Sequence, residues 1–330
     1  MKIAFVFNKK TDDSVEQAEF DTPDTIAAIR TALESGGHRV IEVEMPREDT
    51  RAALSRRLGA MGPDIVFNTA EGYRGVDREG VGPAVFEDLG IPYVGSSAEV
   101  CRLTLDKALT KRTVAASGVR VVEGRFLWRS ADLRAAAAAV GYPVFVKPNY
   151  EGSSKGISPR SVCRSPAELV ACGAECLALF PEGILVERFI AGRDISFPFI
   201  AGLGDEDTLD PLEYTYAGRQ PSEEDIYDYE LKNVNEDDVD CHCPARLASE
   251  TRTQLMSMMK RAERAVGVRD FGRADFRVSA KGEVFFLEMN ALPSLQPNSG
   301  LFAATRQRGL GYSETILKIL AAAMARYEIG

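Results

Sequence analysis

Two segments that lie far apart in the chain carry side chains suited to phosphate and metal chemistry. The first is a glycine- and serine-rich loop that follows Lys147, which stands at the end of an apolar strand pattern. The loop residues are Gly152, Ser153, Ser154, Lys155 and Gly156. Glycine lets successive backbone N–H groups approach phosphate oxygens, and hydroxyl and ammonium groups add donors. A lysine in an apolar strand also needs an anionic partner, because burying an unpaired ammonium is costly. The loop therefore predicts a phosphate site.

The second segment offers oxygen ligands on two neighbouring strands. Glu288 and Asn290 are two residues apart in an apolar strand, so they share one face. Asp275 can join them from the preceding strand of a hairpin that turns at 279–282. Mg²⁺ prefers such ligands and usually keeps phosphate oxygens in its shell. A phosphate grip together with a magnesium site indicates an enzyme that uses ATP.

Each of these features has a simpler interpretation when it is taken alone. A glycine- and serine-rich loop is most often only a loop, and Glu-x-Asn after an apolar strand is most often a solvated strand end. Asp275 could serve only as an ion-pair partner of Arg273. The chain also lacks the Gly-x4-Gly-Lys-Ser/Thr phosphate loop, and Gly202-x-Gly204 lacks the third glycine of a dinucleotide turn. The prediction therefore rests on the combination.

Composition excludes several classes of protein. The 330 residues are 45% hydrophobic and 27% charged, which is ordinary for a globular protein, and the net charge of −9 argues against a nucleic-acid binder. No apolar run approaches the length of a membrane span. The six cysteines do not suggest a disulfide framework, and Cys241-His242-Cys243 lacks zinc-ligand spacing. We expect a cytoplasmic protein.

Strand and helix patterns alternate over the first hundred residues. The expected strands are 3–7, 40–43, 65–67 and 92–94, and the expected helices are 25–35, 49–58 and 81–89. This alternation predicts a parallel sheet with helices on both faces, whose ligands bind at the carboxyl ends of the strands. Those ends lead into polar loops that begin at Asn8 and Asn68.

The sequence resembles the ATP-grasp superfamily, and within it the D-alanine–D-alanine ligase family. The resemblance follows the family's order over most of the chain, in segments 64–68, 89–96, 106–111, 146–156, 186–192 and 273–299. It implies an α/β and α+β architecture, the ATP-grasp fold. The expected units are an N-terminal parallel-sheet domain at 1–102, a small central ATP lobe at 103–190 and a C-terminal α+β lobe at 191–330.

The resemblance also implies how ATP and metal would be held. Lys107 and Lys147 would contact the phosphates together with the 152–156 loop, although Lys107 could be a surface lysine and Lys147 part of a buried ion pair. Glu187 would meet the adenine amino group and the backbone around Ile190 would complete the hinge. Asp194 would accept hydrogen bonds from the ribose; either acid could instead pair with Arg188 or Arg193. Asp275, Glu288 and Asn290 would bind two Mg²⁺ ions, with Mn²⁺ as a possible substitute.

The implied reaction transfers the γ-phosphoryl group of ATP to a carboxylate, and an amine then displaces phosphate from the acyl phosphate. Arg273 would stabilise charge in the transition state, and Lys232 would close over the phosphoryl group. Ser153 is expected to assist catalysis, and Ser299 would meet the carboxylate of the second substrate. The chain has only two histidines, so a histidine-based triad is implausible. Positioning and electrostatics should supply most of the rate.

The sequence differs from the family pattern at positions where the resemblance implies contact with substrates. Glu71 stands where the family has a histidine, and Asn233 follows Lys232 in place of a tyrosine. Ser294 replaces a glycine of the oxyanion site. The first loop lacks the family's Gly-Gly-x-Ser-x-Glu pattern, and of its acids we favour Glu19 for the substrate amine. Its other candidate acids are Glu16 and Asp21.

Carboxylates at this end of the cleft predict a first substrate with a free amino group. Glu71 could alternatively pair only with Arg74 or Arg78 and order its loop. Two rival functions remain open: a ligase that joins a different amino-acid pair, or an amino acid and a small metabolite, in natural-product biosynthesis, and an inactive ATP-binding regulatory protein. The complete ATP-site set argues against the inactive protein. A homodimer is expected.

The acidic, tyrosine-rich segment 221–240 has little apolar periodicity and is predicted to be a mobile lid, with a disordered insertion as the alternative. Lys232 favours the lid because it matches the family's lid lysine. We expect a protease to cut this segment in the free protein and to spare it when an ATP analogue and a substrate are bound together. Limited proteolysis followed by mass spectrometry would check this, and equal cleavage in both states would exclude the lid.

Overall fold

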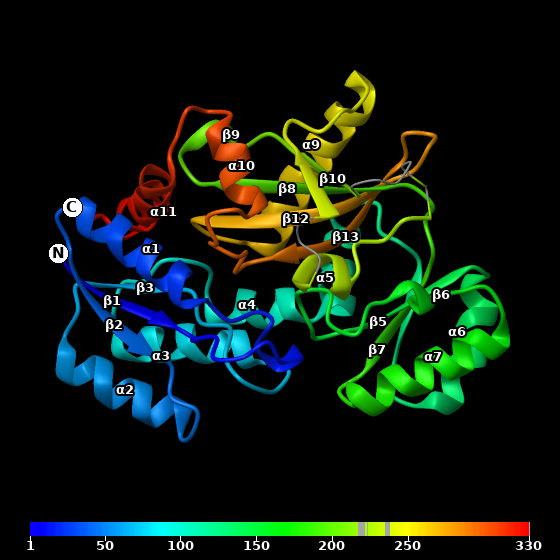
Figure 1. The fold of residues 1–330 in the computed structure, drawn as a ribbon, viewed down its shortest axis with the longest axis horizontal. Helices are drawn as coiled ribbons and strands as arrows, with labels where there is room; N and C mark the ends of the chain where they lie inside the picture. The colour runs from blue at the N-terminus through cyan, green and yellow to red at the C-terminus, as the bar shows by residue number, and fades with distance from the viewer. Residues whose placement is uncertain (217–221, 223, 235–237, 330) are drawn as a thin grey trace.

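The computed structural model describes residues 1–330 except 217–221, 223, 235–237 and 330, and its N-terminal unit is built on a parallel sheet, as predicted (Figure 1). In sheet order the strands are β2 (Arg39–Glu44), β1 (Lys2–Phe7) and β3 (Ile65–Asn68). The helices are α1 (Pro23–Ser35), α2 (Thr50–Met61) and α3 (Val81–Leu89). Helix α1 begins where the Thr22 hydroxyl accepts a hydrogen bond from the Thr25 N–H, and α3 ends at Gly90 in the left-handed region.

The expected fourth strand at 92–94 is wrong, because this segment forms only a single parallel bridge between Tyr93 and Val66. The Val66 N–H donates to the Pro92 carbonyl, and the Val94 N–H donates to the Val66 carbonyl. Pairing then stops at Gly95, whose φ of +104° turns the chain away and whose N–H donates to the Asp270 carboxylate instead. A backbone donor diverted to a side chain cannot extend the ladder.

The central lobe is an antiparallel sheet covered by two helices. Its strands in order are β4 (Gly124–Leu127), β7 (Ile184–Arg188), β5 (Val144–Pro148) and β6 (Val162–Cys163). The helices are α6 (Leu133–Val140) and α7 (Pro166–Leu179). Leu133 and Leu169 pack with Val144, Val146 and Ile184 into a separate apolar core, which keeps β5 and β7 in register.

The C-terminal lobe is a larger antiparallel sheet with α9 (Ser249–Val266) packed against it (Figure 1). In order its strands are β11 (Val239–His242), β10 (Leu212–Tyr216), β8 (Arg193–Ile200), β12 (Phe271–Val278) and β13 (Val284–Asn290), with β9 (Leu203–Thr208) paired to β8. The hairpin of β12 and β13 confirms the one predicted from the sequence, because Gly282 donates its N–H to the Ser279 carbonyl at the turn.

The remaining helices tie the sheets together. They are α4 (Ala98–Leu105), α5 (Lys107–Ala116), α8 (Tyr229–Asn233), α10 (Gly300–Arg306) and α11 (Tyr312–Tyr327), with 3-10 turns at Val15–Gln17, Arg78–Gly80, Ser130–Asp132 and Pro159–Ser161. Helices α4 and α5 pack against the C-terminal sheet, whereas α11 packs against α1. Among the helices that the structure describes, none is long and apolar enough to cross a membrane.

One buried ion pair links the N-terminal unit to the end of the chain. Asp270 is 3% exposed and precedes β12, and its carboxylate accepts hydrogen bonds from Gly95 at 2.7 Å and from Arg326 of α11 at 2.8 Å. Arg326 also donates to the Tyr93 carbonyl. This carboxylate therefore holds three segments that are distant in sequence.

We expect Arg326→Met to lower the free energy of unfolding by about 3 kcal/mol, because Asp270 would stay buried without its cation. Arg51→Met is the matched control, since Arg51 and Asp88 form a surface pair that is 60% and 62% exposed. It should cost less than about 1 kcal/mol. Urea unfolding of the three proteins measures both values, and equal costs would show that the Asp270 pair contributes no more than a surface pair.

Candidate active site

The three sheets meet around a cavity of about 510 Å³. Its walls come from the loop after β1, the glycine- and serine-rich loop, strands β5, β7, β8, β12 and β13, and the segment that leads into α10. Nearly all of the residues singled out from the sequence line it. These are Glu19, Glu71, Lys107, Lys147, Gly152, Ser153, Ser154, Glu187, Ile190, Asp194, Lys232, Arg273, Asp275, Glu288, Asn290 and Ser299.

Gly156 and the candidate acid Glu16 do not line the cavity. Gly156 has a φ of +73°, and a Cβ there would press against Phe180 and Pro148. Gly156 therefore shapes the end of the loop by packing against the central lobe rather than by facing the cavity.

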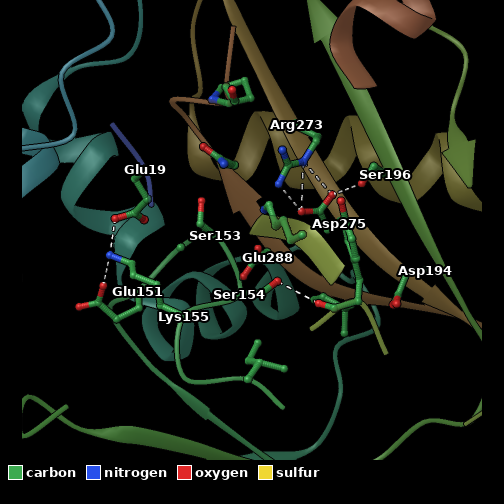
Figure 2. A pocket seen from close by; sticks show the side chains of 18 of the residues that line it. Glu19, Glu151, Ser153, Ser154, Lys155, Asp194, Ser196, Arg273, Asp275 and Glu288 are labelled. Atoms are coloured by element: carbon green, nitrogen blue, oxygen red, sulfur yellow. Dashed lines mark hydrogen bonds and ion pairs between the residues drawn. The ribbon is translucent and has the colours of Figure 1, made fainter. Parts of the chain in front are cut away.

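Strand pairing places the oxygen ligands opposite one another. In the β12–β13 register Asp275 faces Glu288, and Arg273 faces Asn290. Asp275 accepts hydrogen bonds from the Ser196 hydroxyl at 2.6 Å and from Arg273 Nη2 at 2.7 Å, as Figure 2 shows. The ion pair between Asp275 and Arg273, considered as a simpler interpretation of the sequence, is thus present in the site.

The chemistry of this donor set fits Mg²⁺. Asp275 and Glu288 supply two carboxylates, and Asn290 supplies an amide whose Oδ1 accepts the Leu292 N–H at 2.9 Å. Mg²⁺ binds one or two carboxylates and completes its shell with phosphate and water oxygens. Among the described residues no group of three or more His, Cys, Asp and Glu side chains could hold a metal unaided. These ligands are therefore suited to a metal that arrives with a nucleotide.

Two lysines, Lys107 and Lys147, lie close to Glu288. Burial alone would raise the pKa of Glu288, but the nearby positive charges, those of Lys107 and Lys147 first, hold that pKa at about 2. Lys107 Nζ lies 3.5 Å from Glu288 and also donates to the Glu151 carbonyl. Glu288 therefore stays ionised across the neutral range, as a metal ligand must.

Glu187 is 2% exposed and lies between two buried lysines. Lys147 Nζ is 3.1 Å from its carboxylate, and Lys111 forms a shorter ion pair with it. Burial opposes ionisation, but Lys111 and Lys147 lower the pKa of Glu187 below its usual value. The partners of Glu187 are thus these lysines rather than Arg188, and the buried ion pair expected for Lys147 is present. Asp194 pairs with Arg277 at 2.8 Å rather than with Arg193.

Sequence reasoning assigned no role to Lys111, although a signal was available. Lys107 and Lys111 are four residues apart on α5, so they share one face of that helix. Both side chains are buried, at 7% and 5% exposure. The spacing therefore indicated that a second lysine would lie on the same face of α5 as Lys107, and this lysine pairs with Glu187.

The glycine- and serine-rich loop adopts backbone conformations that few residues accept. Ser153 and Ser154 have φ angles of +47° and +55°. The Ser154 hydroxyl, labelled in Figure 2, donates to the Tyr227 carbonyl at 2.9 Å. Asn233 Nδ2 donates to the Ser153 carbonyl at 3.0 Å. The loop is therefore held by the segment that carries Lys232.

The structure describes most of the predicted lid at 221–240, and residues 221, 223 and 235–237 lie outside the described residues. Helix α8 begins at Asp228, whose carboxylate accepts the Leu231 N–H at 3.0 Å, and β11 follows. This N-cap is the signal that sequence reasoning missed when it predicted only a loop. Lys232 in α8 lines the cavity, and burial together with the charge of Arg273 lowers its pKa.

At the other end of the cavity, Glu19 is bound by Arg78 at 3.0 Å and by Lys155 at 2.5 Å. Arg78 is 4% exposed, and no periodic pattern in the sequence marked it as buried. Glu71 also lines the cavity, but among the described residues it has no ion pair with Arg74 or Arg78. The interpretation of Glu71 as a loop-ordering partner of these arginines thus gains no support.

The cysteines and Ser299 are the remaining residues that the sequence analysis discussed. All six cysteines are free, as predicted. Cys241 and His242 lie in β11, where the His242 ring nitrogen Nε2 is hydrogen-bonded to the Thr215 hydroxyl at 2.8 Å. Ser299 begins α10, and its hydroxyl donates to the Ser294 carbonyl at 3.0 Å.

Several known proteins have sequences similar to this chain. Residues 119–321 match the family model for the D-ala D-ala ligase C-terminus. A D-alanine–D-alanine ligase of Geobacter sulfurreducens is 32% identical over 297 residues, which cover 90% of this chain and 87% of that protein. One of Saccharophagus degradans is 32% identical over 295 residues, 89% and 87% of the two chains.

Solved structures show the same fold. The D-alanine–D-alanine ligase from Bacillus anthracis complexed with ATP aligns with a TM-score of 0.77 and 19% identity, over 99% of each chain. The VanG D-Ala:D-Ser ligase from Enterococcus faecalis aligns with a TM-score of 0.74 and 19% identity, over 98% of this chain and 99% of that one.

Asp21 provides a test of the electrostatics at the end of the cavity next to the N-terminal unit. It is 8% exposed and accepts a hydrogen bond from the Thr69 hydroxyl at 2.5 Å. Burial raises its pKa to about 7, and the Thr69 hydrogen bond only partly opposes this. Because the pKa in the folded protein lies above the unfolded value of 3.8, the folded state loses stability as pH rises between them.

We expect Asp21→Asn to remove that loss, because the amide oxygen can still accept from Thr69 but carries no charge. The variant should exceed the parent in stability by a few kcal/mol at about pH 8, and by much less at about pH 5. Asp13→Asn, at a side chain 98% exposed, is the control. Urea unfolding at both pH values measures the difference; a gain independent of pH would show that Asp21 does not titrate in this range.

Proposed function

The chain belongs to the D-alanine–D-alanine ligase family and is an ATP-dependent ligase that forms a C–N bond, and from this premise we propose that it joins two amino acids through an acyl phosphate. The carboxylate of the first attacks the γ-phosphorus of ATP, and ADP leaves. The amine of the second then attacks the acyl carbon, loses a proton and expels phosphate. D-Alanine, which the names of the relatives carry, is the first substrate to test in both positions.

The observation that carries this proposal is that a group of acidic and amide side chains and a group of lysines line the same cavity. Asp275, Glu288 and Asn290 lie on paired strands, and Lys107 and Lys147 approach from the other lobes. An ATP phosphate chain between them would be neutralised from both sides, and two Mg²⁺ ions held by the acidic set would supply Lewis-acid stabilisation.

The nucleotide base and ribose would lie between the central and C-terminal lobes. Glu187 and Ile190 line this part of the cavity, and Asp194 stands at the start of β8. We assign the adenine amino group to Glu187 and the ribose hydroxyls to Asp194. Because Lys111 and Lys147 hold Glu187 ionised, its carboxylate can only accept hydrogen bonds, which suits an exocyclic amine.

Around the transferred group, Arg273 and Lys232 supply charge. Arg273 donates three hydrogen bonds from Nε and Nη2 to the Asp275 carboxylate, so its guanidinium is fixed before substrates arrive. Fixed donors stabilise developing charge without reorganisation. Lys232 lies in α8, next to the glycine- and serine-rich loop, where Ser153 would contact phosphate. Ser299 would bind the carboxylate of the second substrate.

Glu19 and Glu71 line the end of the cavity where the first substrate would lie. Since Glu71 and Asn233 differ from the family pattern, a pair other than two D-alanines is the second candidate. Release of ADP with a panel of D- and L-amino acids and Mg²⁺, followed by mass analysis of the product, tests both. ATP binding without turnover on any acid would overturn the proposal. The homodimer and the cytoplasmic location stay predictions.

We expect Glu288→Gln to lower turnover by about a hundredfold or more, because one charged metal ligand is lost. Glu283→Gln is the matched control on the same hairpin, since Glu283 is 49% exposed and pairs with Arg120. ADP release and circular dichroism should show a folded, inactive variant beside an active control. A near-normal rate for Glu288→Gln would remove this residue from the metal site.

A further inference from the structure

The end of the cavity next to the N-terminal unit holds more carboxyl groups than cations. Four glutamates, Glu19, Glu71, Glu79 and Glu151, line it together with Asp21. The cations that contact these glutamates are Arg78 and Lys155, whereas Lys10, which also lines this end, pairs with Asp13. Lys107, which also reaches this region, faces Glu288. Because a buried charge needs an opposite partner, the way in which the two cations are shared among the four acids decides what else the site can bind.

Both cations are taken by Glu19 and Glu151. Arg78 lies 3.0 Å from Glu19 and 3.7 Å from Glu151, and Lys155 contacts both carboxylates (Figure 2). These contacts hold the pKa of Glu19 at about 2 against the effect of burial. Arg78 also donates to the Tyr150 carbonyl at 2.6 Å. Glu19 is therefore already neutralised by the protein.

Glu19 has a second contact that explains its place. A Cβ on Gly152 would overlap the Glu19 carboxylate, so the glycine- and serine-rich loop lies directly against it. Figure 2 shows Glu19 and Glu151 on either side of Lys155, next to Ser153. These contacts fix the loop in place. Because they already occupy the Glu19 carboxylate, we look to the other acids for binding of substrate.

Glu71 and Glu79 feel the charges of Arg78 and Lys155, but the ion pairs of these two cations are with Glu19 and Glu151. Glu79 is 8% exposed and lines the cavity, yet among the described residues it has no hydrogen bond or ion pair. Glu71 lines the cavity beside it, and burial and the charge of Glu79 raise the pKa of Glu71 well above its usual value. Burial likewise raises the pKa of Glu79 to about 7. Among the described residues, neither Glu71 nor Glu79, which both line the cavity, has a side-chain hydrogen bond.

We propose that Glu71 and Glu79 form the binding site for the amino group of the first substrate, and that Glu19 is a positioning residue for the glycine- and serine-rich loop. This inference rests on the proposed function for the identity of the first substrate. An ammonium group has three N–H donors and one positive charge, which the pair of carboxyls can accept together. Glu79 is the residue that sequence reasoning did not single out.

The same arrangement restricts the class of first substrate. It favours an amino acid with a free amine and an uncharged or basic side chain. An acidic side chain would meet two further carboxyls in a buried site, where repulsion between like charges is screened less than in water. A 2-hydroxy acid would keep the reacting carboxylate but lose the charged donor, so it should bind more weakly than the amino acid of the same shape.

The test compares binding of alanine and lactate, each as both enantiomers, to the full-length protein with Mg²⁺ and a non-hydrolysable ATP analogue. Calorimetry gives the ratio of the two affinities for the parent, Glu79→Gln, Glu71→Gln, Glu19→Gln and Asp77→Asn. Asp77→Asn is the matched control, because Asp77 lies in the same segment, is exposed and does not line the cavity. Because no turnover is needed, this measurement is independent of the ADP-release panel.

We expect the parent to prefer alanine by about tenfold or more, since hydrogen bonds to a charged group are involved. Glu79→Gln and Glu71→Gln should abolish that preference, and Asp77→Asn should keep it. Glu19→Gln should also keep it while weakening binding of the ATP analogue, because the loop loses its support. A preference that survives in both Glu79→Gln and Glu71→Gln, disappears only in Glu19→Gln, or is missing in the parent would overturn the proposal.

Discussion

A buried ammonium must face an opposite charge, and the structure around the cavity depends on this constraint. Four lysines of 7% exposure or less come from α5, β5 and the serine loop: Lys107, Lys111, Lys147 and Lys155. Their partners are Glu288 on β13, Glu187 on β7 and Glu19 in the N-terminal unit. Each pair joins segments from different parts of the chain. The need to pair each buried lysine with a carboxylate therefore also helps to hold these parts of the chain together.

The parts of this arrangement that are local in sequence could be predicted. Glu288 and Asn290 share a strand face and Asp275 sits across a short turn, so the spacing alone determined how these side chains meet. The segment at 92–94 could not be predicted correctly, because the distant Asp270 carboxylate removes the Gly95 N–H from the ladder. Arg78 and Glu79 are polar residues in a glycine-rich loop, and nothing in a periodic pattern reveals that such residues are buried.

The two ends of the cavity differ in how their charges are balanced. In the part of the cavity lined by β7 and β13, Glu187 and Glu288 both have cation partners, and their pKa values are lowered. At the end next to the N-terminal unit, Asp21 and Glu79 have pKa values raised to about 7 by burial. The carboxylates of the first group are therefore neutralised by lysines of the protein, whereas those of the second group have no such partner among the residues that the structure describes. A glutamate in place of the family's histidine at residue 71 belongs to this second, open end.

The packing of α11 on α1 has a consequence for synthesis on the ribosome. Ile3 and Ile29 of the first unit share an apolar core with Ile316 and Ile319, which emerge some three hundred residues later. Until α11 leaves the exit tunnel, the nascent chain presents the outer face of α1 to water. Contacts of such long sequence separation form late and expose the incomplete chain to aggregation. Chaperone occupancy on the growing polypeptide should therefore end only when the last helix docks.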